Sequence, residues 1–159
     1  MTYERFEDLP VWKTAIDLAE KIYALTEKTL FSRKYSLRDQ PERATLSISN
    51  NVAEEFERGT TQELLTFLYI ARGSAGEVRS ILCFIERLKA FQELKPEISD
   101  LKSLAESISR QLRAWADSLQ NSEIKGQRYL NEKERKLAQD KKKREEFMAT
   151  LKNYQKPKD

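Results

Sequence analysis

Apolar side chains recur at three- and four-residue spacing in four separate stretches of this chain, which is the period of an α-helix. The longest stretch covers residues 61–89, where the apolar positions run from Leu64 to Leu88. The two-residue alternation of a half-buried strand is not sustained anywhere in the sequence. The pattern therefore predicts an all-α protein.

Proline, glycine and capping residues mark the limits of these helices. Pro10 opens the first helix, where its missing N–H costs nothing. Ser36 or Asp39 is predicted to cap the second helix, with Pro41 in its opening turn and Gly59 as its C-cap. The segment TTQE, residues 60–63, reads as a capping box for the next helix. The predicted helices span residues 9–28, 36–59, 61–89 and 96–120.

Short connections between such helices favour antiparallel neighbours, so we predict an up-down-up-down four-helix bundle over residues 1–120. Residues 121–159 have a different composition, with twelve Lys or Arg against seven Asp or Glu. This basic charged tail contains opposite charges four residues apart, which support a solvated helix only weakly. Two alternatives stay open for it, a helix without tertiary contacts and a disordered segment.

The composition removes the usual components of several chemistries. The chain has no histidine and one cysteine, Cys83, so it lacks the ligands of a zinc site and the base of a Ser/His or Cys/His nucleophile. Cys83 lies among apolar residues and is interpreted as a small buried side chain. Carboxylate chemistry is what remains for an enzyme. We expect no enzymatic activity, no cofactor and no metal.

The N-terminal residues and the hydropathy of the sequence predict a cellular location. Residues 1–8 carry three acidic side chains and no apolar run, which is unlike a signal or transit peptide. No stretch reaches the roughly 18 apolar residues of a membrane span. We expect a soluble, cytoplasmic protein that contacts no membrane.

The stretch SISNNVAEEFERG, residues 47–59, is unusually polar for a helix interior. Ala44, Ile48, Val52 and Phe56 share a strip that resembles ordinary core. A second strip contains Ser47, Asn50 or Asn51, Glu54 and Arg58, and it has three interpretations. It is a solvated face, a structural network in which Asn51 and Glu54 bond to a basic residue such as Arg43 or Arg72, or a catalytic or metal-binding carboxylate cluster.

Two glycines inside the third helix, Gly73 and Gly76, raise a related question. Each would cost about 1 kcal/mol relative to alanine in an isolated helix. We predict that the offset is a close approach by another helix, within one chain or between copies of it. On this interpretation the polar residues of both helices are mainly architectural.

Two segments carry a resemblance to a known family: FEDLPVWKTAIDLAEKIYALT, residues 6–26, and RATLSISNNVAEEFERGTTQELLTFLYIARGSAGEVRSIL, residues 43–82. They resemble the four-helix-bundle proteins encoded in intervening sequences of bacterial large-subunit ribosomal RNA genes. The same fold family includes the accessory variability proteins of diversity-generating retroelements. The resemblance covers residues 6–120. One departure is Glu55, where the family usually has glycine.

The resemblance implies a homopentamer without enzymatic activity. For the retroelement branch it also implies binding of RNA and of a partner reverse transcriptase through a basic surface. The positions that match the family most specifically include our candidates for structural or interface residues: Trp12, Ser47, Asn51, Glu54, Gly73, Ser74 and Glu77.

The function predicted from the sequence is a non-enzymatic, homo-oligomeric scaffold that binds nucleic acid, most plausibly RNA. The candidate nucleic-acid-binding residues on the bundle are Arg38, Arg43, Arg58, Arg72 and Arg79. Those on the tail are Arg128, Lys133, Arg135, Lys136, Lys141, Lys142, Lys143 and Arg144. The alternatives are a tail that only aids solubility and a protein-interaction adaptor without a nucleic-acid role.

Overall fold

The computed structural model describes residues 3–58, 61–121 and 143–144, with the side chains of residues 58 and 61–63 left aside. The chain divides into two units, Met1–Gly126 and Gln127–Asp159. Within the described residues every regular element is helical and none is a strand. The all-α prediction is confirmed. The predicted domain boundary at residue 120 stays a prediction.

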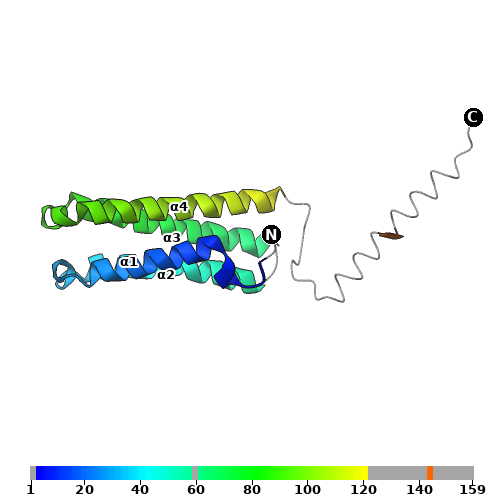
Figure 1. Cartoon of the computed structure of the whole chain (residues 1–159), viewed down its shortest axis with the longest axis horizontal. Coiled ribbons are helices and arrows are strands. Elements are labelled where there is room, and N and C mark those ends of the chain that lie inside the picture. Colours follow the sequence, from blue (N-terminus) through cyan, green and yellow to red (C-terminus); the bar gives the residue numbers. More distant parts are fainter. Residues whose placement is uncertain (1–2, 59–60, 122–142, 145–159) are drawn as a thin grey trace, which may run out of the picture. The chain divides into compact units, whose positions relative to one another are not determined.

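Four long helices make up the first unit (Figure 1). They are α1 (Pro10–Thr26), α2 (Tyr35–Arg58), α3 (Thr61–Arg87) and α4 (Lys95–Gln120). Three short 3-10 helices precede or connect them: η1 (Phe6–Asp8), η2 (Thr29–Phe31) and η3 (Lys89–Leu94). Figure 1 shows each long helix running back alongside the one before it, which is consistent with the predicted up-down-up-down bundle.

Side-chain contacts between α3 and α4 fix their relative direction. Near the end of α3, Glu86 accepts a 2.6 Å hydrogen bond from Lys102 near the start of α4. At the other end, Gln120 on α4 donates to the Tyr69 hydroxyl on α3 at 2.9 Å. The end of each helix thus meets the start of the other, so the two helices are antiparallel.

The core follows a spacing close to 3.5 residues, as in helices that pack knobs into holes. On α3 the buried positions alternate by four and three residues from Leu64 to Ile85. On α1 the same spacing runs from Val11 to Leu25. Trp12, a candidate structural or interface residue, is half-buried on α1 and packs edge-on against Phe6.

The start of α2 differs from the prediction. The Arg38 amide donates to the Lys34 carbonyl at 3.2 Å, so helical bonding begins before Ser36 and Asp39, which therefore do not cap the helix. Pro41 is consequently inside the helix, where it has no N–H to donate to the residue four positions earlier. The predicted C-cap at Gly59 and the capping box at 60–63 lie outside the described residues and side chains.

Within the described part of the chain, no other helix packs closely against the two glycines of α3. A Cβ placed on Gly73 or Gly76 meets no atom within 4 Å, and both residues are exposed. That form of the prediction is wrong for the part of the chain that the structure describes, because the seven-residue repeat turns both positions away from the core.

Gly76→Ala should therefore stabilise the protein by about 1 kcal/mol, because alanine is the better helix former and the space is open. Urea denaturation of the variant measures this difference. Ser80→Ala, at another exposed site on α3, is the control and should change stability by no more than about 0.5 kcal/mol. A destabilised Gly76→Ala variant would contradict an open surface at this position.

The Glu86–Lys102 bond makes part of the stability dependent on pH. The hydrogen bond from Lys102 lowers the pKa of Glu86 below its ordinary value of 4.5. The same bond raises the pKa of Lys102. The ionised Glu86 carboxylate therefore contributes fully to the free energy of unfolding above pH 4.5, and this contribution is lost as the pH falls through the lowered pKa. The contribution of the charged Lys102 side chain is lost only in strong base.

Glu86→Gln should accordingly lower Tm at pH 7, and the Tm difference from wild type should shrink toward pH 3. Calorimetry at the two pH values measures it. Glu93→Gln, which removes an exposed carboxylate, should show nearly the same Tm difference at both pH values. A Glu86→Gln difference that does not change with pH would rule out this ion pair as a source of acid sensitivity.

Candidate functional site

A small polar cluster joins α2 to α3 in the middle of the bundle. The Ser74 hydroxyl, which is only 9% exposed, lies 3.0 Å from Ser47 Oγ and 3.1 Å from the Ile70 carbonyl. The Asn51 amide donates to the Ser47 carbonyl at 2.6 Å and to its hydroxyl at 3.1 Å. These bonds satisfy polar groups that would be costly to bury alone, so the cluster holds the two helices in register.

Other residues predicted for this network lie elsewhere. Arg43 is exposed and faces Asp39 on its own helix at 3.7 Å rather than Asn51. Glu54 and Glu77 are exposed on α2 and α3. Glu55, the departure from the family pattern, is 1% exposed and lies on the core-facing side of α2.

The structure assembles no metal-binding cluster in the residues it describes. There, no group of three or more Asp, Glu or Cys residues comes together in a way that could hold a metal ion. Cys83 is a free, half-buried thiol. No helix in the described part is both long enough and apolar enough to cross a bilayer.

The predicted arginines of the bundle do not form one patch. Arg38 pairs with Glu42 at 3.1 Å, and Glu42 also accepts a bond from Thr26 of α1, so Arg38 lies at the α1–α2 side. Arg79 lies 3.9 Å from Glu106 of α4, at the α3–α4 side. Arg72 is half-buried on α3.

Most of the predicted tail residues are outside the described residues. Of the tail set, the structure describes Lys143 and Arg144, which are helical and exposed. The other six tail residues, and the side chain of Arg58, stay predictions.

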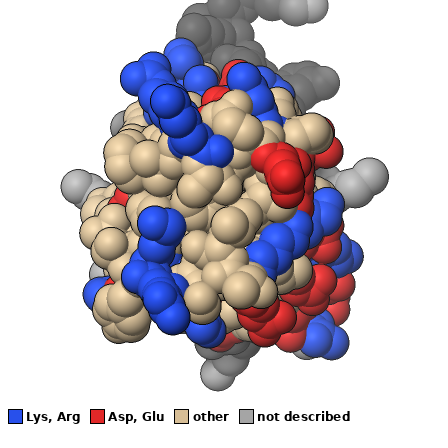
Figure 2. Space-filling model, turned by 90° about the vertical axis from the view of Figure 1, so that its left-hand side faces the viewer, with Lys and Arg blue, Asp and Glu red and all other residues tan. Residues whose placement is uncertain are grey.

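The structure also brings together cations that we did not predict as a site. They lie at the end of the bundle that carries the α1–α2 and α3–α4 connections, and we call them the basic end: Arg33, Lys34, Arg87, Lys89 and Lys95. Figure 2 shows this end, with Lys and Arg at the top, left and right, and with Asp and Glu mostly at the right and lower right beside some of them. In the sequence, only the adjacent pair Arg33 and Lys34 indicates a basic surface here, because the other three cations lie more than fifty residues later in the chain.

A second surface feature is an exposed strip on α3, which we define as Ile70, Gly73, Glu77, Ser80 and Phe84. These residues recur at three- and four-residue spacing, so they share one side of the helix. Ile70 is 46% exposed and Phe84 is 53% exposed. The two apolar side chains therefore lie at opposite ends of the strip, with Gly73, Glu77 and Ser80 between them.

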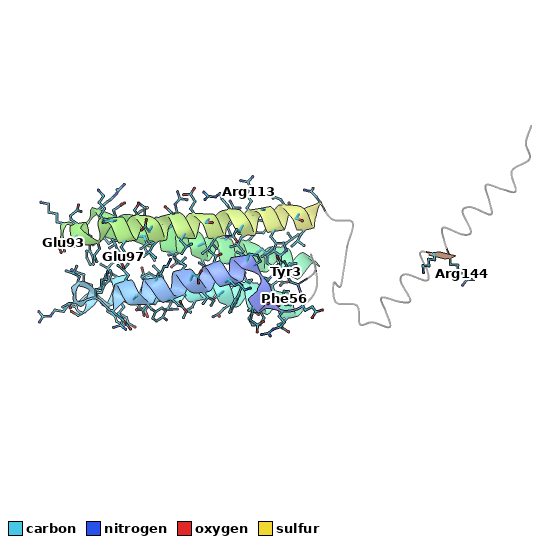
Figure 3. All side chains as sticks on the ribbon, in the orientation of Figure 1. Tyr3, Phe56, Glu93, Glu97, Arg113 and Arg144 are labelled. Atoms are coloured by element: carbon cyan, nitrogen blue, oxygen red, sulfur yellow. The ribbon has the colours of Figure 1, made fainter. Side chains whose placement is uncertain are left out.

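An open groove of about 580 Å³ separates α1 from α4. Lys21 and Ala24 line it from α1, and Leu101 and Leu104 line it from α4. Glu97, which Figure 3 labels, also lines the groove and is bonded to Lys28.

The described residues thus define a helical-bundle protein. A family model described as 23S rRNA-intervening sequence protein matches residues 7–114. The chain belongs to this family, which confirms the resemblance drawn from the sequence. No curated protein matches the chain.

Proposed function

We propose that the protein is a non-enzymatic homo-oligomer, pentameric as the resemblance implies, that binds RNA in the cytoplasm. The observation that carries the proposal is the family match over residues 7–114, because the name of that family refers to sequences within 23S ribosomal RNA. A reverse transcriptase is the further protein partner that the resemblance to the retroelement branch implies.

The charge distribution supports an RNA partner. The tail carries an excess of five positive charges, from twelve basic and seven acidic residues. Phosphate contacts from Lys and Arg release counterions from the nucleic acid and supply most of the non-specific affinity. Assembly of several chains would multiply these contacts on one particle.

The exposed strip on α3 supports self-association. Ile70 and Phe84 present apolar area to solvent, and the glycine between them leaves the backbone accessible. Another copy of the chain covering this strip would remove that area from water.

Two measurements on the purified full-length protein test the proposal. Light scattering should give a multiple of the 18.7 kDa chain mass, five for the pentamer. Mobility-shift titration at two salt concentrations should show RNA binding that weakens steeply with salt. A protein that stays a single chain contradicts the assembly, and one that binds no RNA below about 10 micromolar at low salt contradicts the RNA role.

The genomic context separates the finer versions of the proposal. A reverse transcriptase gene beside variable and template repeats would support the accessory role, and a location inside a ribosomal RNA gene would support the intervening-sequence class. An oligomer without RNA affinity would favour the protein-interaction adaptor instead.

A further inference from the structure

Two aromatic rings hold the connections at the basic end together. Phe31 of η2 and Phe91 of η3 pack edge to face with ring centroids 4.8 Å apart. Both rings are buried, at 1% and 0% exposure. Segments sixty residues apart in sequence are therefore fixed next to each other, and so are the charged residues that flank them.

The cations of the basic end make no ion pairs within the described residues, although Arg87 and Lys95 lie near enough to Glu86 to help lower its pKa. Arg33, Lys34, Arg87, Lys89 and Lys95 are all exposed, and none makes an ion pair with a residue that the structure describes. By contrast, Arg110 and Arg113 on α4 each pair with a carboxylate four residues away.

The acidic residues at this end compensate only part of the positive charge of these cations. Glu97 is bonded to Lys28, and Glu86 is bonded to Lys102. Glu27 and Glu93 are exposed at the same end. The five exposed cations outnumber the exposed carboxylates at this end, which are Glu27, Glu93 and Asp100, so the surplus charge is positive.

An exposed aromatic ring lies directly beside these cations. Tyr35, the residue after Lys34, is 78% exposed, and its hydroxyl donates to Asp39 at 3.3 Å. That bond holds the side chain along the first turn of α2. An accessible aromatic ring next to an unpaired cation is an arrangement that proteins use to stack an unpaired base and hold its phosphate.

We propose that the basic end binds a single-stranded segment or loop of RNA, with its cations on the phosphates and Tyr35 stacked on a base. This inference rests on the proposed RNA-binding function and assigns a surface and a ligand class to it. Duplex RNA presents its phosphates but no free base face, so it uses the cations without the tyrosine.

Two charge variants of the full-length protein test the surface. In the first, Arg33, Lys34, Lys89 and Lys95 are each replaced by Gln. The control replaces Lys13, Lys21, Arg110 and Arg113, four exposed cations on α1 and α4, in the same way. Both variants have the same net charge, and circular dichroism verifies that both are folded.

Binding of a fluorescent single-stranded RNA is titrated at several salt concentrations. The first variant should lose about three units from the slope of log affinity against log salt, about 0.7 for each lost contact. Its affinity at moderate salt should fall at least tenfold, while the control keeps the wild-type slope. Equal slopes in the two variants would overturn the inference and leave the proposed function standing, whereas a wild-type protein without RNA affinity would remove both.

Tyr35→Ala tests the ligand class separately. It should weaken binding of single-stranded RNA about tenfold with no change in the salt slope, and should leave duplex RNA binding unchanged. An equal loss for both RNAs, or no loss for either, would show that the tyrosine does not stack on a base. Stronger binding of anionic vesicles than of RNA by the wild-type protein would overturn the assignment of the surface to RNA.

Discussion

Replacement of Phe91 by alanine should destabilise the protein by about 3–5 kcal/mol, the range for removing a large aromatic side chain from a packed core. Phe91 has no exposed area, and its ring meets Phe31 edge-on. The variant loses the transfer free energy of the ring, the contact with Phe31, and the packing of atoms around the cavity that remains. Urea denaturation followed by circular dichroism measures the change.

Tyr35→Ala is the matched control, because it also removes an aromatic ring, at a site 78% exposed. It should alter stability by no more than about 0.5 kcal/mol. A loss below about 1 kcal/mol in Phe91→Ala would mean that the aromatic pair does not hold the two connections together. The geometry inferred for the basic end would then lose its support.

The four helices were predictable from sequence because two independent signals agree. Apolar residues such as Leu68, Ala75 and Leu82 recur at the helical period, and Pro10 and Pro96 stand where helices begin. These signals are local, so one sequence is enough to read them. They give the existence of each helix more securely than its ends.

The misplaced start of α2 shows the limit of local signals. Ser36 and Asp39 are good capping residues, yet the chain enters the helix earlier, where the Lys34 carbonyl accepts from Arg38. η2 precedes this point and places Phe31 in the core. Tertiary packing of Phe31 therefore constrains where α2 begins, and no capping rule contains that information.

The glycines of α3 show a second limit. Composition indicates that Gly73 and Gly76 weaken an isolated helix, but only the direction of each residue reveals that both face outward. Likewise, Arg33 and Lys89 become neighbours at one end only through the path of the helices between them. The candidate surface therefore could not be predicted from the sequence, although each of its residues was visible there.

The substitution of glutamate for both Ile70 and Phe84 should dissociate the proposed assembly. In a single chain about half of each side chain is exposed, so the exchange costs little folding stability. In an assembly that covers the strip, two carboxylates would lose water without gaining a partner in every copy. We expect light scattering to give the single-chain mass of 18.7 kDa, with an unchanged circular dichroism spectrum.

Leu30→Glu with Tyr35→Glu is the control, since it adds the same charge at two exposed apolar positions away from α3. The assembly should survive this change. If the control dissociates equally, the added charge rather than the strip is responsible, and if neither variant dissociates, the copies meet through another face. In that last case the open glycine in the strip would still lack a structural reason, because within the described residues no other helix approaches it.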